Sequence, residues 1–330
     1  MPAAHSFHQH AAAGQPTAQM RNFGDGIFAL DSGYVRDEFD AVHLIVEQGR
    51  VAVIDTATQY AVPRILEALR GLGLGPESVD WILLTHIHLD HAGGAGALLE
   101  RCPNARVTVH PRGLKHLADP SKLWAAVCDV YGAEMAIREY GGMDPIPTDR
   151  LIETPEGAVV ELAGRKIEFW DAPGHARHHV FIRDCHTNSF FTGDTFGISY
   201  RDFDTAQGAY VFVTSSPSQF NPEELKASVR RISDAAPPAV YLTHYAQVRD
   251  VGRHAQHLTK QIDDFCEIAL AHQGAGLARA DLIQKDLARL IVSELRDHGV
   301  TLSDAACREV LALDLKLNSD GLVCWLDSLK

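Results

Sequence analysis

The chain has 330 residues, of which 46% are apolar, enough for one large domain or two ordinary ones with a substantial core. Its formal net charge of −13 argues against a nucleic-acid partner, because phosphate binding needs an electropositive surface. The apolar runs are too short to cross a bilayer and the first residues lack signal-peptide features, so we expect a cytoplasmic protein with no membrane partner. Six scattered cysteines predict free thiols.

The first part of the chain predicts strands followed by alternating strands and helices. Residues 1–20 are rich in Ala, Gln, His and Pro without an apolar period, which predicts a mobile arm. Ile65 and Leu69 share one face of a predicted helix over 61–72. Apolar segments predict strands at 26–30, 41–46, 51–54, 81–84 and 106–109. This order is typical of an α/β layered domain.

Residues 111–150 interrupt that alternation. Asp119-Pro120 is typical of a helix start, and the helix that follows carries Trp124 and Tyr131. Such a helical insertion, placed directly after a histidine-rich loop, predicts a wall or lid near the site. A helix that only packs its apolar face on the domain is an equally good interpretation.

The second part predicts more strands and then a helical end. Asn221-Pro222 predicts a helix start, and Ser303-Asp304 predicts another. Apolar segments predict strands at 158–162, 166–170, 180–182, 189–192 and 239–243. We therefore expect a main domain over 21–255 and a helical C-terminal region over 256–330 that serves packing or a homodimer interface.

The stretch Thr85-His86-Ile87-His88-Leu89-Asp90-His91 concentrates side chains of the metal-ligand type. It holds three histidines and a carboxylate between a predicted buried strand and a Gly-rich turn into a helix. Imidazole and carboxylate suit Zn, Mn or Fe rather than a thiolate-loving metal. Asp55, at the end of an earlier strand, either supports this loop from behind or caps the turn that begins at Thr56.

Three more ligand-type residues stand where α/β folds display chemistry. His175 follows a Pro-Gly turn, Asp194 ends a predicted strand and His244 ends another. With the loop, these make seven groups, more than one tetrahedral ion can use. Two metal ions that share Asp194 would use all seven.

In this order, Thr-His-x-His-x-Asp-His, Pro-Gly-His, Gly-Asp-Thr and a strand-end His resemble the metallo-β-lactamase-fold superfamily over roughly residues 22–250. The resemblance implies a four-layer αββα sandwich of two mixed sheets, with the metals at one edge. No Cys stands at a ligand position, which sets the chain apart from true β-lactamases. The ligands that the resemblance implies are His86, His88 and His175 for the first metal, Asp90, His91 and His244 for the second, and Asp194 as the bridge.

The predicted chemistry follows from two cations about 3.5–4 Å apart, which can hold a bridging hydroxide and lower a water pKa from roughly 15.7 toward ~7. We expect two divalent ions, Zn²⁺ first and Fe or Mn as alternatives, that hydrolyse a small ester, lactone or thioester. Asp90 would be a ligand or a proton shuttle. Tyr200 or Tyr245 would assist at the oxyanion, although core or surface packing is the better interpretation of either tyrosine taken singly. His179 resembles the family's non-ligand histidine, with a structural hydrogen bond.

Within the superfamily the chain resembles the glyoxalase II and lactonase-like branch. Its His-Ile-His-Leu-Asp-His-Ala-Gly spelling favours a lactonase-like member, and its acidic balance disfavours the nucleases. The alternative is an iron-dependent redox enzyme of the same fold, either persulfide dioxygenase-like or a diiron oxygen-reacting protein. The flavodiiron pattern has Glu where this chain has His88, which counts against the diiron type.

Overall fold

The computed structural model describes residues 20–215 and 219–329 of the chain, which divide into two compact units. The first unit runs to Val109 and resumes over Leu114–Ile152, and the second comprises His110–Gly113 and the chain from Glu153 onward. The predicted arm over residues 1–20 lies outside the described residues except for Met20, which already belongs to a strand.

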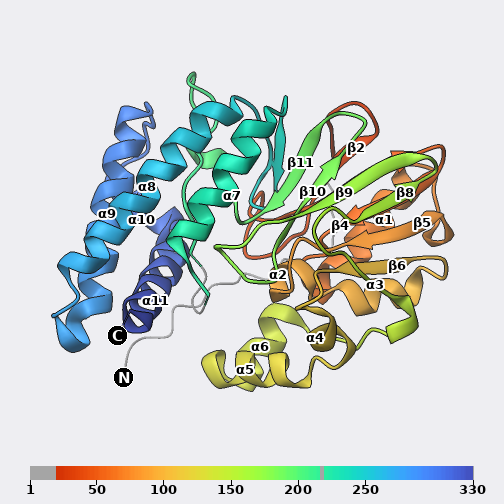
Figure 1. Cartoon of the computed structure of the whole chain (residues 1–330), viewed down its shortest axis with the longest axis horizontal. Helices are drawn as coiled ribbons and strands as arrows, with labels where there is room; N and C mark the ends of the chain where they lie inside the picture. Colours follow the sequence, from red (N-terminus) through yellow and green to blue (C-terminus); the bar gives the residue numbers. More distant parts are fainter. Residues whose placement is uncertain (1–19, 216–218, 330) are drawn as a thin grey trace. The chain divides into compact units, whose positions relative to one another are not determined.

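A seven-stranded mixed sheet, in the order β1 to β7, forms the base of the first unit (Figure 1). The first four strands pair antiparallel, whereas β4, β5 and β6 run parallel. The strands are β1 Met20–Asn22, β2 Ile27–Asp31, β3 Ala41–Glu47, β4 Arg50–Ile54, β5 Val79–Leu83, β6 Arg106–Val109 and β7 Leu151–Glu153. Ile54 at the end of β4 pairs with Leu83 at the end of β5, so the segments that follow both strands start at one edge of the sheet.

The helices of the first unit bury apolar faces against this sheet. The predicted helix over 61–72 is α1, Val62–Gly71, and it buries Ile65 and Leu69 in the core with the sheet residues. Each such side chain contributes about 1.5–3 kcal/mol when removed from water. The remaining helical segments are η1 Gln59–Ala61, η2 Pro76–Ser78, α2 Leu89–Ala92, α3 Ala95–Arg101, α4 Leu114–Ala118, α5 Ser121–Tyr131, α6 Ala133–Tyr140 and η3 Thr148–Arg150.

The helical insertion differs slightly from the prediction. Asp119 accepts a hydrogen bond from the amide of Ser121 at 3.1 Å, so α5 starts after Pro120 rather than with it. Leu123 packs on the core of the unit, as an ordinary amphipathic helix would. Trp124 is half-buried, and the side chain of Tyr131 lies outside the described part of the structure. The role of this segment as a lid stays a prediction.

A six-stranded mixed sheet, in the order β13-β12-β11-β10-β9-β8, forms the base of the second unit. Its strands are β8 Val159–Leu162, β9 Arg165–Asp171, β10 Val180–Asp184, β11 Ser189–Gly193, β12 Val240–Leu242 and β13 Ala246–Val248. Every pair is antiparallel except β11 with β12. Because these two run parallel and Gly193 pairs with Leu242, the residues after both strands emerge at one edge of the sheet.

The predicted C-terminal helical region is confirmed. The helical segments of the second unit are η4 Arg201–Phe203, α7 Pro222–Ala235, α8 Val251–Ala271, η5 Gly276–Ala278, α9 Arg279–Asp297, α10 Asp304–Val310 and α11 Ala312–Ser328. In Figure 1, α7, α8 and α9 follow one another, and α11 packs on α8 and α9. The predicted caps are also present, because Asn221 accepts from the amide of Glu224 and Ser303 from that of Ala306. Within the described residues, no helix has the length and apolar character needed to cross a membrane.

Candidate metal centre

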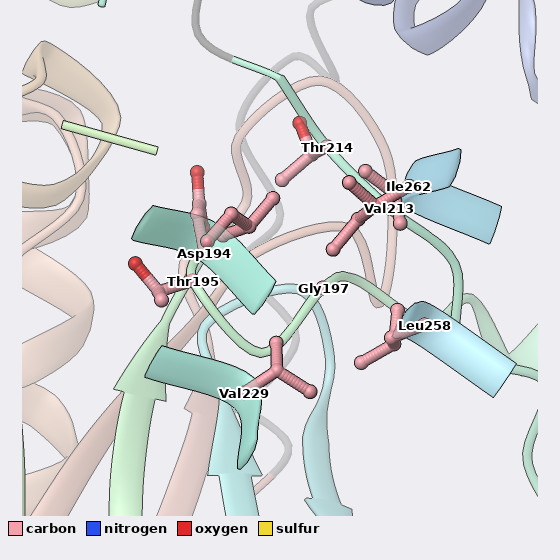
Figure 2. Close-up of a pocket in the computed structure, with 9 residues that line it drawn as sticks. Asp194, Thr195, Gly197, Val213, Thr214, Val229, Leu258 and Ile262 are labelled. Atoms are coloured by element: carbon pink, nitrogen blue, oxygen red, sulfur yellow. The ribbon is translucent and has the colours of Figure 1, made fainter. Parts of the chain in front are cut away.

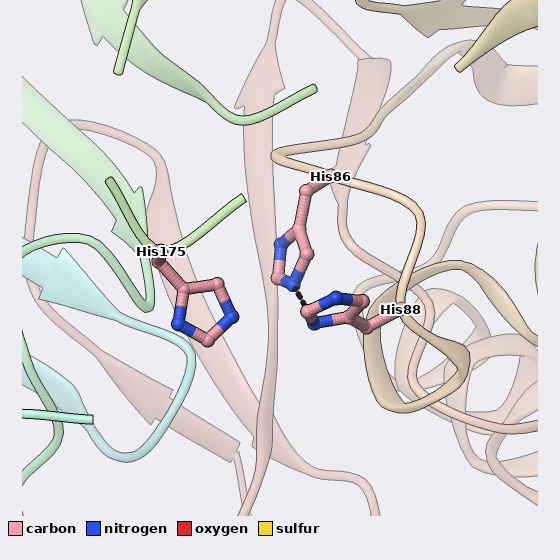
Figure 3. Close-up of side chains that lie close together, drawn as sticks. All are labelled: His86, His88 and His175. Carbon is pink, nitrogen blue, oxygen red and sulfur yellow. Dashed lines mark hydrogen bonds between the residues drawn. The ribbon is translucent and has the colours of Figure 1, made fainter. Parts of the chain in front are cut away.

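The histidine-rich loop follows β5 in the first unit and leads into α2. His86 and His91 are buried, and their rings lie 4.0 Å apart. Nε2 of His86 lies 2.8 Å from Nδ1 of His88, and Figure 3 shows the two rings turned toward each other. Two imidazole nitrogens on one zinc ion lie roughly 3.3 Å apart, given Zn–N bonds of about 2.0–2.1 Å. The pair is therefore spaced almost as two ligands of a single ion.

Asp55 supports this loop from the end of β4. Its Oδ1 accepts a hydrogen bond from the Thr85 amide at 2.8 Å, and its Oδ2 accepts one from the Thr85 hydroxyl at 2.8 Å. The same Oδ2 lies 2.8 Å from Nδ1 of His91. A proton held on Nδ1 by this carboxylate makes Nε2 of His91 the nitrogen that can bind a metal. The interpretation of Asp55 as a support of the loop is confirmed.

Asp90 faces the same region as His91. Its Oδ2 lies 3.9 Å from Nε2 of His91, and 28% of its side chain is exposed. A carboxylate that is partly exposed can both bind a cation and exchange protons with water. The four predicted ligands of the first unit thus lie on the loop after β5 and in α2, which begins at Leu89.

The second unit brings its three predicted ligands together at one edge of its sheet. His175 follows β9, Asp194 follows β11 and His244 follows β12, and all three are buried. Oδ2 of Asp194 lies 3.5 Å from Nε2 of His175, and its Oδ1 lies 3.7 Å from Nε2 of His244. Each carboxylate oxygen thus faces a different histidine, the arrangement that a bridging ligand needs.

Neighbouring groups hold these ligands in place. Nδ1 of His175 lies 3.4 Å from the carbonyl oxygen of Thr214, a contact that leaves Nε2 as the nitrogen for a metal. His179 accepts a hydrogen bond from the Asp194 amide at 3.2 Å, which confirms its predicted structural role. Figure 2 shows the narrow recess that Asp194 shares with apolar side chains of α7, α8 and the segment before residue 215, namely Val213, Leu225, Val229, Leu258 and Ile262. Such apolar surroundings strengthen the attraction of the carboxylate for cations.

The two tyrosines predicted to assist at the oxyanion are both buried. The hydroxyl of Tyr200 donates to the carboxylate of Asp314 in α11, with O···O distances of 3.0 and 3.1 Å, and so joins the segment after β11 to the C-terminal helices. Tyr245 directly follows His244 and is 1% exposed. The catalytic roles of Tyr200 and Tyr245 stay predictions.

The structure adds residues to the site that the sequence interpretation missed. Thr85 and Thr214 supply the hydrogen bonds described above, although only Thr85 carries a signal, as the first letter of the histidine motif.

The sequence profile of the metallo-beta-lactamase superfamily matches residues 36–244. The chain belongs to this superfamily. Its His and Asp groups could bind metal ions, as the family name implies.

Three curated relatives are similar in sequence to part of the chain. Metallo-beta-lactamase fold-containing protein ST1585 of Sulfurisphaera tokodaii is 27% identical over 172 residues, which are 51% of this chain and 61% of the relative. A hydroxyacylglutathione hydrolase of Synechococcus is 33% identical over 144 residues, 43% of this chain and 45% of the relative. Putative diflavin flavoprotein A 1 of Nostoc is 23% identical over 226 residues, 66% of this chain and 34% of the relative. The matches thus span less than two thirds of each relative.

A solved structure supports the fold. That of ST1585 superposes with a TM-score of 0.58 and 23% identity, and the match covers 72% of this chain and 86% of the other. The predicted fold class, an α/β sandwich with two mixed sheets, is confirmed.

Proposed function

We propose that the chain is a metal-dependent hydrolase that holds two divalent ions, Zn²⁺ first, and acts on a small ester, lactone or thioester. The observation that carries this proposal is the position of Asp194, whose two oxygens face two different histidines. The acidic net charge supports a small-molecule substrate rather than a nucleic acid. A cytoplasmic location and a homodimer belong to the same proposal.

The proposed ligand sets are those that the order of the motifs implies. They are His86, His88 and His175 for one ion, Asp90, His91 and His244 for the other, and Asp194 for both. Five imidazoles and two carboxylates suit Zn²⁺, Fe or Mn. Ions of this kind, when bound, supply a nucleophile at neutral pH and polarise a carbonyl group. Asp90, which is partly exposed, is the residue of this chain that we assign to proton exchange with the substrate.

A redox enzyme that uses iron is the second candidate. The diflavin flavoprotein relative supports it, whereas the hydroxyacylglutathione hydrolase relative supports hydrolysis. We favour hydrolysis because His88 stands where the flavodiiron pattern has Glu.

The metal and substrate test separates these candidates. Protein loaded with Zn²⁺ is expected to hydrolyse at least one compound in a panel of small esters, lactones and thioesters. Chelation should lower the rate by about 100-fold or more, and Zn²⁺ should restore it. Absence of turnover by the Zn²⁺ form, together with oxygen consumption by the Fe form in the presence of a persulfide or an electron donor, would instead establish the redox candidate.

Asp55→Asn is expected to weaken binding of the ion that we assign to His91. Asn keeps the size of the side chain and tolerates the positive φ of 52° at this position, but it removes the charge that orients the His91 ring. Loss of such a support costs about 10–100-fold in metal affinity. Competition with a chelator measures the metal affinity. Asp80→Asn is the matched control, because Asp80 is a carboxylate of the same sheet that pairs with Arg50. Equal affinities of wild type and Asp55→Asn would refute this role of Asp55.

A further inference from the structure

We propose that Asn318 and Gln261, two buried side-chain amides of the C-terminal helices, position the metal ligand His175 through the backbone of Thr214. The inference rests on the metal centre of the proposed function, and it gives the helical C-terminal region a part in metal binding. Both residues act through a backbone carbonyl group, so they are positioning residues.

The carbonyl group of Thr214 is the link between these amides and His175. Its oxygen lies 3.4 Å from Nδ1 of His175, and Nε2 of the same ring faces Asp194 at 3.5 Å. A hydrogen bond that keeps the proton on Nδ1 makes Nε2 the metal-binding nitrogen and fixes the plane of the ring. The direction of the Thr214 carbonyl therefore decides how well His175 can bind an ion.

Asn318 of α11 holds the peptide group to which this carbonyl belongs. The carbonyl of Thr214 and the amide of Ser215 lie in one planar, trans peptide group and point in opposite directions. Oδ1 of Asn318 accepts a hydrogen bond from that amide at 2.6 Å, and Nδ2 donates to the Val213 carbonyl at 3.2 Å. The Ser215 hydroxyl in turn donates to the backbone carbonyl of Asn318 at 3.2 Å. One side chain thus fixes both peptide groups of Thr214.

Gln261 of α8 holds the peptide group before these two. Its Oε1 accepts a hydrogen bond from the Val213 amide at 2.6 Å. Its Nε2 donates to Glu294 of α9 at 2.6 Å and to the Tyr210 hydroxyl at 3.2 Å, which uses both of its N–H groups and fixes its orientation. Gln261 and Asn318 are both 0% exposed, so water cannot replace a hydrogen bond that either of them loses.

The segment over residues 194–215 also connects α11 to a second proposed ligand. It begins with the proposed bridging ligand, and its Ser199 amide donates to the His244 carbonyl at 2.5 Å. The hydroxyl of the next residue, Tyr200, donates to Asp314 of α11. The segment is therefore fastened to α11 at two places, one close to each histidine ligand that it contacts.

Asn318→Leu replaces the amide by an apolar group of similar size and is expected to weaken binding of the Zn²⁺ ion assigned to His175 by about 10–100-fold. Competition with a chelator measures the affinity of the full-length protein. Gln261→Leu acts two peptide groups further from the Thr214 carbonyl, so its loss should be smaller.

The tautomer of His175 in the metal-free protein provides a second readout. Nitrogen NMR of protein with labelled histidine, assigned with His175→Gln, should show the Nδ1–H form in wild type. Asn318→Leu should show a mixture of tautomers, because a proton on Nε2 can donate to Asp194 once the Thr214 carbonyl is no longer held.

Two control variants separate positioning from a general loss of stability. Asp184→Ala breaks a buried ion pair at the other end of the sheet, because Asp184 pairs with Ser189, the first residue of β11, whereas Asp194 follows the last. Ser319→Ala removes a hydrogen bond that joins α11 to the Ala280 carbonyl in α9, at 2.8 Å. Both variants should keep the Zn²⁺ affinity and the His175 tautomer of wild type.

The outcomes separate this inference from the hydrolase proposal. If wild type hydrolyses the panel and Asn318→Leu keeps its Zn²⁺ affinity and its tautomer, the positioning inference is wrong and the hydrolase proposal stands. If wild type binds Zn²⁺ without hydrolysing any compound, and Asn318→Leu but neither control weakens binding, the inference stands and the hydrolase proposal falls. Equal losses in Asn318→Leu and Asp184→Ala would overturn the inference. Gln261→Leu carries the same comparison if Asn318→Leu does not fold.

Discussion

Asp194→Ala is expected to lower the metal content from two ions per chain toward none and to reduce hydrolysis by about 100-fold or more, beyond the effect of a supporting residue. The reason is that its oxygens face both His175 and His244, at 3.5 and 3.7 Å, so one substitution removes a ligand from each ion. The carboxylate also offsets the repulsion between the two cations, which is large for ions about 3.5–4 Å apart in apolar surroundings.

Asp90→Ala provides the comparison. Asp90 belongs to one proposed ligand set only, so its loss should spare the ion assigned to His86, His88 and His175 and cost mainly the other. Elemental analysis after gel filtration measures the metal content of both variants, and circular dichroism checks that they are folded. Asp327→Ala, an exposed carboxylate of α11, should retain both ions. Two ions and normal turnover in Asp194→Ala would eliminate the bridging role.

Asp184→Ala is expected to lower the free energy of unfolding by about 3–5 kcal/mol, because it leaves the guanidinium of Arg165 buried without its counter-ion. The two side chains form a bidentate pair, with Nε to Oδ1 at 2.9 Å and Nη2 to Oδ2 at 2.6 Å, and they are 3% and 0% exposed. Thr187 also donates to this carboxylate. Urea unfolding at pH 7 measures the loss.

Two controls sharpen this prediction. Asp327→Ala breaks a bidentate pair with Arg279 in which the carboxylate is about half exposed. Because surface ion pairs contribute about 0–1 kcal/mol, this variant should lose no more than that from its free energy of unfolding. The double variant Arg165→Leu with Asp184→Ala removes both charges and should be less destabilised than either single variant. A loss below about 1 kcal/mol in Asp184→Ala would contradict the buried-pair account.

The same pair predicts a pH dependence of stability. Burial alone would raise the pKa of the Asp184 carboxyl, but hydrogen bonds from Arg165 and Thr187 outweigh it and hold the pKa below its usual value. A folded-state pKa below the unfolded value of about 3.9 means that the stabilisation is present above about pH 4 and is lost as the pH falls through the folded-state pKa. The difference in the free energy of unfolding between wild type and Asp184→Ala should therefore become smaller below about pH 4. A constant difference down to pH 3 would exclude this origin.

Local signals predicted most of the elements and the ligand types. The helical spacing of Ile65 and Leu69 predicts α1, apolar segments predict the longer strands, and the spacing of His86, His88 and His91 identifies the ligand loop without any tertiary contact. The predicted strand over 239–243 is shorter, Val240–Leu242, because only three residues pair with both neighbours. Strands as short as β1 and β13 carry too few residues for a periodic pattern.

Contacts between distant segments could not be predicted. The Gln59–Asp144 hydrogen bond depends on where the helical insertion packs, and the Tyr200–Asp314 bond depends on where α11 packs. Neither arrangement has a sequence period, because a single side-chain contact between remote residues leaves no local spacing to detect. The role of Asp55, in contrast, was one of two open interpretations, and only the hydrogen bond to His91 decides between them.

Anomalous diffraction at the metal absorption edge, from crystals of the wild-type protein grown with Zn²⁺, tests the central claim most directly. The account predicts two peaks about 3.5–4 Å apart, with one Asp194 oxygen on each and the remaining ligands divided as proposed. A single peak, or two peaks of which neither contacts Asp194, would contradict the dinuclear centre and the hydrolase proposal that depends on it.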